Sequence, residues 1–226
     1  MSGISGWDKP TLEWWRGEDG DAYMRRNAPT PEYIAMRAET FRGIFGRLPT
    51  PVQSILEVGC GPGANLAAIA SISRVELTGI DPNASAREVS RSLCQGYRLA
   101  GPTILVVDDH AGGIRFSAGM FDLVMTCGVL IHLDPTKKDG LKAAIREIYR
   151  VARRYILIME YFSPQPMAVK YRGAQEGLLW KLDYGAEFLA AHPDLLVVDY
   201  GFLWSKRTAF DDLNWWLLQK PEVAQP

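Results

Sequence analysis

Short apolar runs alternate with amphipathic stretches along most of the chain. The runs are rich in aliphatic and aromatic residues, which indicates buried strands. They predict seven strands, at 55–58, 75–80, 103–107, 121–127, 155–161, 195–200 and 214–218. The amphipathic stretches predict helices at 22–27, 32–45, 65–71, 84–99 and 183–191, with a further long helix that begins at 134–136. The pattern predicts an α/β protein whose last two strands close the sheet as a hairpin.

The residues before the first strand carry two different patterns. The apolar residues of the predicted helix 32–45 form one stripe, which favours core packing over a ligand surface; the stripe consists of Tyr33, Met36, Phe41, Ile44 and Phe45. The stretch from Trp15 onward, with Tyr23, Arg26 and Asn27, is not spaced as one apolar face. It fits either a solvated helix or a lid that folds over a ligand. We therefore expect an N-terminal helical lid segment at 1–50 and the main α/β domain at 51–226.

Three glycines break the chain directly after the first strand, within the stretch S-I-L-E-V-G-C-G-P-G-A that begins at Ser54. Glycine permits a sharp turn and lets a ligand lie against the backbone. A strand, a glycine turn and a helix together open a nucleotide-binding βαβ unit. Gly59, Gly61 and Ala64 loosely fit the dinucleotide fingerprint G-x-G-x-x-G/A.

The carboxylate of Glu57, in the same strand, discriminates between nucleotides. A pyrophosphate at the turn would lie close to it, and like charges a few Å apart in a half-dry cleft repel by roughly several kcal/mol. A ligand with a cationic amine would be attracted instead. S-adenosylmethionine (SAM) has no phosphate and carries an α-ammonium group, so Glu57, Gly59 and Gly61 predict SAM as the cofactor.

Further acids follow the next two strands. Asp81 lies 24 residues after Glu57, at the tip of the second predicted strand. A carboxylate there can accept hydrogen bonds from both hydroxyls of a ribose, although Asp81-Pro82 could also begin the following helix. Asp108 and Asp109 follow the third strand, where an acid can accept from an adenine amino group. One of the two could serve only the turn.

The loop after the fourth strand should line the active site, because ligands of open α/β sheets bind at the carboxyl ends of the strands. It contains Cys127, Gly128, His132 and Asp134. His132 could act as a general base or be a structural histidine. Cys127 is a poor candidate nucleophile, since no histidine partner is evident.

The irregular segment 162–180 follows the fifth strand and is rich in proline, glycine and aromatic residues. Long irregular segments after a sheet strand are often functional loops. Within it, Tyr171 and Arg172 could close over the site and contact the substrate, with Tyr171 also a candidate for the catalytic step.

Composition narrows the functional classes. The net charge is −1 and no block of Lys and Arg occurs, so a general nucleic-acid binder is not expected. The three cysteines show no paired spacing and the three histidines are scattered, which favours a reducing compartment and no metal site. No signal peptide and no membrane-spanning run is evident. We expect a cytoplasmic monomer or homodimer that acts on a small molecule.

Several motifs together resemble one family. They are W-x-G-E-x-G-x-x-Y-x-x-R-N from Trp15, L-E-V-G-C-G-x-G-x-N from Leu56, G-V-L-I-H-L-x-P from Gly128, Y-F-x-P from Tyr161, Y-R-G from Tyr171 and D-Y-G-F to D-D-L-N-W-W-L-L-Q-K in the tail. This pattern resembles class I SAM-dependent methyltransferases, and among them a bacterial subgroup often labelled pseudaminic acid biosynthesis-associated methylase. The resemblance covers nearly the whole chain.

The resemblance implies a Rossmann-like, mostly parallel sheet of order 3-2-1-4-5-7-6 with an antiparallel seventh strand and helices on both faces. It places the methionine end of SAM at Glu57, Gly59 and Gly61, the ribose at Asp81, and the adenine at Asp108 or Asp109. One departure concerns the loop after His132. The subgroup usually continues I-N-P, whereas this chain has Leu133-Asp134-Pro135, so a carboxylate replaces an amide near the reacting centre.

These observations support methyl transfer from SAM to a small molecule, such as a sugar, a glycan precursor or a natural-product intermediate. His132 or Asp134 would accept a proton where the acceptor must lose one. An alternative keeps SAM as the sole substrate, because some proteins similar to this subgroup close SAM to azetidine-2-carboxylate and methylthioadenosine. A scaffold without catalysis and a dinucleotide oxidoreductase are the remaining hypotheses, and Glu57 argues against the last.

Overall fold

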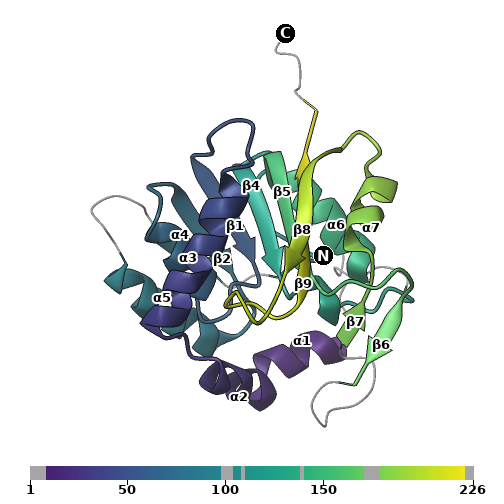
Figure 1. Ribbon diagram of the computed structural model, residues 1–226. Helices are drawn as coiled ribbons and strands as arrows, with labels where there is room; N and C mark the ends of the chain where they lie inside the picture. Colours follow the sequence, from purple (N-terminus) through teal and green to yellow (C-terminus); the bar gives the residue numbers. More distant parts are fainter. Residues whose placement is uncertain (1–8, 98–103, 108–109, 138–139, 171–178, 222–226) are drawn as a thin grey trace.

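The computed structural model describes residues 9–97, 104–107, 110–137, 140–170 and 179–221. A seven-stranded sheet forms the centre of the molecule (Figure 1), and its strands lie in the order β3-β2-β1-β4-β5-β9-β8. The strands are β1 (Ser54–Val58), β2 (Glu76–Ile80), β3 (Ile104–Val107), β4 (Phe121–Cys127), β5 (Ala152–Glu160), β8 (Leu196–Leu203) and β9 (Leu213–Gln219). Numbered along the chain within this sheet, they run 3-2-1-4-5-7-6, and only the seventh is antiparallel to its neighbours.

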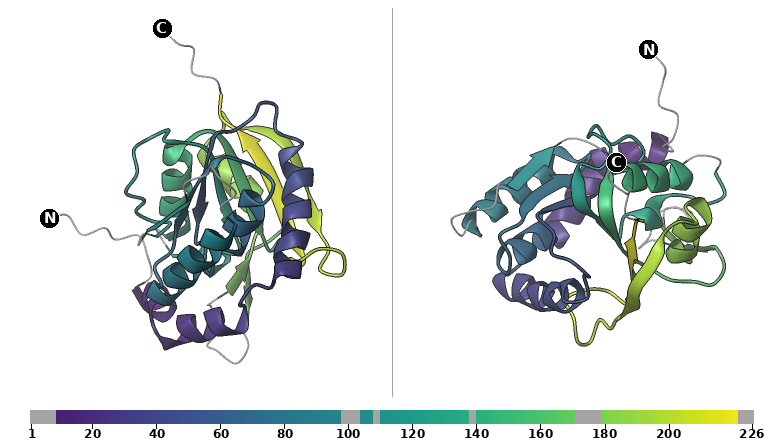
Figure 2. Two further views of the ribbon diagram at one scale, coloured as in Figure 1. Left: turned by 90° about the vertical axis from the view of Figure 1, so that its left-hand side faces the viewer. Right: turned by 90° about the horizontal axis from the view of Figure 1, so that it is seen from above.

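Helices cover both faces of the sheet, as the view from above in Figure 2 shows. The helices are α1 (Lys9–Arg16), α2 (Glu18–Arg26), α3 (Pro31–Phe45), α4 (Ala64–Ala70), α5 (Ala84–Gly96), α6 (Gly140–Val151) and α7 (Tyr184–Ala191), with a 3-10 turn, η1 (Leu130–His132). α3 and α4 pack on one face, and α6 and α7 on the other. The α/β class with a mostly parallel sheet is therefore confirmed.

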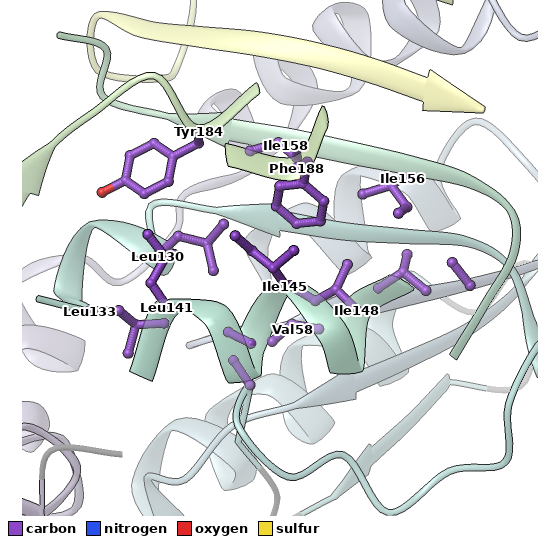
Figure 3. Close-up of a cluster of buried hydrophobic side chains, with 14 of the residues drawn as sticks. Val58, Leu130, Leu133, Leu141, Ile145, Ile148, Ile156, Ile158, Tyr184 and Phe188 are labelled. Carbon is purple, nitrogen blue, oxygen red and sulfur yellow. The ribbon is translucent and has the colours of Figure 1, made fainter. Parts of the chain in front are cut away.

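Two hydrophobic cores separate these layers because successive strand residues point to opposite faces. In β1, Leu56 and Val58 belong to the core under α6 and α7, whereas Ile55 belongs to the core under α3 and α4. Figure 3 shows the first of these cores, with Ile145 and Ile148 of α6 beside Phe188 of α7 and the strands. The sheet is thus buried on both sides, as parallel sheets usually are.

α1 and α2 lie across the end of the sheet at which the parallel strands finish (Figures 1 and 2). The two helices meet at a close approach, since a Cβ at Gly20 would lie 2.1 Å from the carbonyl oxygen of Trp15. The buried side chain of Asn83 joins them to the turn before α5: its Nδ2 donates to the Trp15 carbonyl oxygen at 2.8 Å and to Asp21 Oδ1 at 3.0 Å. The N-terminal helices are therefore attached to the main sheet by hydrogen bonds as well as by contact.

Several details differ from the sequence predictions. A small antiparallel sheet, β6 (Met167–Val169) with β7 (Leu179–Lys181), occupies part of the segment predicted to be irregular. α1 was not predicted at all. The long helix begins at Gly140 instead of 134–136. These differences concern short elements and element ends, where tertiary contacts override weak local signals.

The stripe predicted in α3 is partly wrong. Phe41 and Ile44 are buried, but Tyr33 is 37% and Met36 is 47% exposed. The buried stripe is made by Ile34, Ala38, Phe41 and Ile44 instead. Tyr33 and Met36 lie toward the side of the helix that borders the cavity described below. Among the described residues, no helix has both the length and the apolar character to cross a bilayer.

Candidate active site

A cavity of about 610 Å³ opens at the carboxyl ends of the central strands. Its walls come from the turn after β1, the ends of β2 and β4, the N-terminal helices, α3 and the segment between β8 and β9. This volume lies within the range of roughly 300–1,000 Å³ that is common for small-molecule sites. The position agrees with the rule for open α/β sheets, in which ligands bind outside the carboxyl ends of the strands.

The glycine turn forms the floor of this cavity. Gly59, Gly61 and Gly63 all have positive φ, at 71°, 51° and 84°. A Cβ at Gly59 would lie 2.4 Å from Cγ2 of Val129, so this position needs glycine for space as well as conformation. The backbone N–H of Gly59 donates to the Ile80 carbonyl oxygen at 2.7 Å, which joins the turn to β2. The turn predicted from the sequence is therefore present and is held rigidly against its neighbours.

Glu57 is 1% exposed and lines the cavity. Its Oε1 accepts a hydrogen bond from Asn65 Nδ2 at 2.6 Å, while its Oε2 has no partner among the described residues. Burial raises the pKa of Glu57 to about 8, against the opposing effects of the Asn65 hydrogen bond and the charge of Arg37. A cationic donor placed at Oε2 would lower this pKa and supply the missing hydrogen bond. The geometry agrees with the prediction of an amine at this point.

Asp81 also lies at the cavity and is largely buried. Its Oδ2 accepts from the backbone N–H of Gly61 at 2.9 Å, and its Oδ1 accepts from that of Asn83 at 2.8 Å. The alternative that Asp81 caps the next helix is wrong. The N-cap of α5 is Asn83, whose side chain accepts from the N–H of Ala86.

Aromatic side chains of the N-terminal helices enclose the cavity from above. The ring of Trp15 lies 4.6 Å from that of His132 and 5.2 Å from that of Tyr23, both edge-on. Trp15, Tyr23 and Asn27 line the cavity, whereas Arg26 is exposed and does not. The structure thus brings most of the predicted lid residues to the cavity, but it does not bring Arg26 there.

The loop after β4 contributes Cys127, Gly128 and His132 to the cavity wall. Burial raises the pKa of the Cys127 thiol to about 12, so it is neutral and unsuited to act as a nucleophile. Asp134 does not line the cavity. Its Oδ1 accepts from the backbone N–H and the hydroxyl of Thr136, at 2.9 and 2.7 Å, which is the pattern of a turn.

Arg37 of α3 lines the cavity and was not singled out from the sequence. Its guanidinium donates to Asn65 Oδ1, to the hydroxyl of Tyr33 and to the carbonyl oxygen of Ala209, the last at 3.2 Å. It also lies 4.1 Å from the centre of the Phe210 ring. Arg37 therefore links the glycine turn to the segment between β8 and β9. The only sequence signal was its i,i+4 spacing from Tyr33, which is weak.

The segment between β8 and β9 supplies the far wall of the cavity, and sequence reasoning did not predict this. Ser205, Thr208, Phe210 and Asp211 line it. The hydroxyl of Tyr161, at the end of β5, donates to Asp211 Oδ2 at 2.6 Å. Polar and aromatic groups thus face the space beyond the glycine turn.

Four predicted site residues, Asp108, Asp109, Tyr171 and Arg172, lie outside the described residues. Among those that the structure describes, no group of His, Cys, Asp and Glu is arranged to hold a metal ion.

Comparison with known proteins agrees with this geometry. Residues 55–154 match a family model described as a methyltransferase domain. The matched residues run from β1 to the start of β5 and include the glycine turn, Asp81 and the loop with His132. No curated protein sequence matches the chain.

Several solved structures share the fold of this chain over nearly its whole length. Magnesium protoporphyrin IX methyltransferase from Synechocystis PCC 6803, with bound S-adenosylhomocysteine (SAH), is 14% identical with a TM-score of 0.68, over 95% of this chain and 100% of that one. The 1,6-didemethyltoxoflavin-N1-methyltransferase of Burkholderia thailandensis is 16% identical with a TM-score of 0.69, over 98% and 94%.

A third similar structure has a different reaction in its name. The [4+2]-cyclase SpnF is 16% identical with a TM-score of 0.61, over 82% of this chain and 81% of that one. The chain therefore has the fold of solved SAM-dependent methyltransferases.

Proposed function

We propose that this protein is a SAM-dependent methyltransferase that acts on a small molecule by in-line methyl transfer. The observation that carries the proposal is the set of residues that line the cavity. One half is formed by the glycine turn, Glu57 and Asp81, which suit SAM, and the other half is formed by a different set of polar and aromatic groups. A cavity with two chemically distinct halves suits a cofactor and an acceptor together.

In the cofactor half, the methionine end of SAM would lie against the glycine turn. Its ammonium would donate to Glu57 Oε2, which has no partner among the described residues. The two ribose hydroxyls would donate to the carboxylate of Asp81, which lines the cavity. Tyr23 and Trp15 would lie over the cofactor, where an aromatic face attracts a sulfonium by about 0.5–2 kcal/mol.

In the acceptor half, Tyr161, Asp211, Ser205 and Thr208 offer hydrogen bonds to hydroxyl or amine groups, and Phe210 offers an apolar face. A sugar, a glycan precursor or a natural-product intermediate fits this mixture, and the resemblance to the pseudaminic acid-associated subgroup favours the same classes. The net charge of −1 gives no reason to expect a nucleic acid.

The chemical step requires little of the protein, because the sulfonium is already an activated methyl donor. The protein aligns the acceptor with the S–CH3 bond and excludes water. His132 is the candidate proton acceptor, since it lines the cavity and is oriented by the ring of Trp15. Asp134 is not retained in this role because it lies outside the cavity wall.

The decisive experiment is to incubate the purified protein with SAM alone and follow the products by mass spectrometry. The proposal expects intact SAM, with SAH released only after a pool of candidate metabolites is added. The metabolite whose mass increases by one methyl group identifies the acceptor. Methylthioadenosine and a four-carbon cyclic amino acid from SAM alone would instead establish the cyclising reaction.

Two isosteric variants test the cofactor site directly. Glu57→Gln and Asp81→Asn should each weaken SAH binding by about tenfold or more, because each removes a charged acceptor worth at least about 1.4 kcal/mol. Isothermal titration calorimetry gives the affinities. Asp199→Asn is the matched control, since this acid pairs with Arg47 away from the cavity. Unchanged SAH affinity in both site variants would refute the proposed cofactor positions.

A further inference from the structure

Glu160, the last residue of β5, makes an unusual set of hydrogen bonds. Its side chain is fully buried. Oε1 accepts from the backbone N–H groups of Val129 and Leu130, at 3.1 and 3.2 Å, and Oε2 from that of Ile131 at 3.4 Å. One carboxylate therefore binds three consecutive N–H groups of the loop that follows β4.

This loop determines the shape of the site. It leaves β4 at Gly128, which has a φ of 65°, and continues through η1 to His132 in the cavity wall. The side chain of Val129 packs against Gly59, as the 2.4 Å approach to a Cβ at that glycine shows. The backbone that Glu160 holds thus touches the glycine turn at one end and carries His132 at the other.

A buried carboxylate in this position costs desolvation free energy unless its hydrogen bonds offset that cost. Residues Tyr155–Met159, which precede it in β5, are all buried and mostly aliphatic, so an apolar side chain would be the default. Three N–H groups at the start of a helical turn have no partners within that turn. An ionised carboxylate satisfies all three at once, which offsets part of its own desolvation.

We propose that Glu160 is a positioning residue for the methyl-transfer site, holding segment 128–132 against the glycine turn and so fixing where His132 stands. That the reaction is methyl transfer rests on the proposed function. The arrangement of the loop itself does not depend on that identity, because it is defined by the hydrogen bonds of Glu160.

Because Glu160 can gain a proton, the strength with which it holds this loop should depend on pH. Burial raises the pKa of Glu160 to about 7, against the opposing effect of its hydrogen bonds to the loop. Among the described residues, Tyr184 from α7 and Cys127 from β4 are ionisable groups whose charge would interact with that of Glu160, and burial raises the pKa of both. Both are therefore neutral near pH 7, so Glu160 is the group among them that titrates in this range.

The test compares wild-type protein with Glu160→Gln by hydrogen exchange of the peptide that covers residues 128–133. The glutamine side chain keeps one acceptor oxygen and loses the charge and the second acceptor. We expect protection of the Val129 to Ile131 amides to fall by about tenfold or more in the variant. In the wild type, protection should also fall as the pH drops below about 7, and in the variant it should not depend on pH in this range.

Turnover provides a second readout. Methyl transfer by Glu160→Gln should fall by about tenfold or more, and the kcat of the wild type should decrease on the acid side with the same pH dependence as the protection. If no acceptor is found, the proposed function fails but the exchange result still decides the role of Glu160. Equal protection in both proteins at every pH would overturn the inference.

Glu147→Gln is the matched control. Glu147 also accepts from a backbone N–H, that of Ile114 at 3.1 Å, but it does so beside Arg150 and away from the cavity. Its loss should leave protection of residues 128–133 and turnover unchanged. Should Glu160→Gln fail to fold, the pH dependence of protection in the wild-type protein decides between the outcomes, because no such dependence is expected if the hydrogen bonds of Glu160 do not hold this loop.

Discussion

At the scale of single residues, Arg37 joins parts of the chain that are far apart in sequence. Its hydrogen-bond partners Asn65 and Ala209 lie 28 and 172 residues away. Through Asn65 it is connected to Glu57, and through Ala209 and Phe210 to the segment between β8 and β9. The guanidinium has donors in several directions, so one side chain can fix both halves of the cavity.

Replacing Arg37 with methionine should therefore destabilise the protein and loosen this segment. Hydrogen bonds to a charged group contribute about 1.5–3 kcal/mol, and we expect a loss of that size in the free energy of unfolding. Urea denaturation measures the loss, and limited proteolysis should show cleavage within 204–213 in the variant.

Arg42→Met is the matched control, in the same helix. Arg42 is 59% exposed and, in the part of the chain that the structure describes, pairs with the exposed Glu39, so its removal should change the free energy of unfolding by less than about 0.5 kcal/mol. If the two variants are equally stable, the connecting role of Arg37 is wrong.

The residues of the site divide into those that sequence could indicate and those that it could not. Glu57, Asp81 and His132 could be indicated because a strand end or a loop after a strand fixes their position in the fold. Arg37 and Asp211 could not, because they lie in an ordinary helix and an ordinary loop, and only the folded chain brings them to the cavity. Asp134 was misjudged because a turn-forming acid and a catalytic acid look alike in sequence.

At the scale of elements, the N-terminal helices are held to the main sheet by Asn83. This residue has two functions in the structure. Its side-chain oxygen caps α5, and its Nδ2 donates to the Trp15 carbonyl oxygen and to Asp21. The attachment of α1 and α2, and with them the aromatic cover of the cavity, depends on these donors.

Serine at position 83 separates the two functions, because its hydroxyl can cap α5 but cannot reach both helices. Asn83→Ser should leave α5 intact and increase hydrogen exchange in residues 11–24, since the Trp15 carbonyl oxygen and the Asp21 carboxylate both lose a hydrogen-bond donor. SAH should also bind more weakly, because Trp15 and Tyr23 are no longer held over the cavity.

Asp183→Ser is a suitable comparison, since Asp183 caps α7 by accepting from Ala186 and lies in another part of the molecule. It should leave exchange in residues 11–24 and SAH affinity as in the wild type. Unaltered exchange of residues 11–24 in Asn83→Ser would show that α1 and α2 are held by packing alone.

The elements themselves were predicted well where the apolar pattern is strong. All seven strands of the main sheet and helices α3 to α7 occur where the pattern places them, apart from their ends. α1, β6 and β7 were missed because they are short and their hydrophobic residues contact neighbours that the local pattern does not reveal. The predicted stripe of α3 failed at Tyr33 and Met36, which face the cavity and not the core.

At the scale of the whole molecule, the sheet order could not be derived from periodicity. β1 pairs with β2 and β4, and the choice of neighbours depends on contacts between distant segments. The order stated from the sequence came from the family resemblance alone. The result of this order is that the ends of β1, β2, β4 and β5 meet at one edge, where Glu57 and Glu160 are both buried.

Two buried carboxyls with raised pKa values should make the stability of the whole protein depend on pH. The pKa of Glu57 is raised to about 8 and that of Glu160 to about 7, from an ordinary 4.5. Between the ordinary and the raised value, the native state binds more protons than the unfolded state, so the free energy of unfolding decreases as the pH rises. His192 acts in the opposite direction, because burial lowers its pKa from 6.5.

We therefore expect the ligand-free protein to melt at a lower temperature at about pH 8.5 than at about pH 5.5, by several degrees, since about 1 kcal/mol shifts Tm by roughly 2–4 °C in a chain of this size. Circular dichroism at matched ionic strength measures Tm. Glu57→Gln should reduce the difference, because the variant has no charge to desolvate. Asp199→Asn, in an acid paired at the surface with Arg47, should retain it.

The pKa of Glu57 should also make the stabilisation by bound SAH depend on pH. In the proposed binding mode the SAH ammonium would stabilise the ionised form of Glu57, so SAH should raise Tm more at about pH 8.5 than at about pH 5.5, and this pH dependence should vanish in Glu57→Gln. A ligand-free protein that melts at the same or a higher temperature at the alkaline pH would show that neither carboxyl is held with a raised pKa. An SAH stabilisation that does not change with pH would place the ammonium away from Glu57.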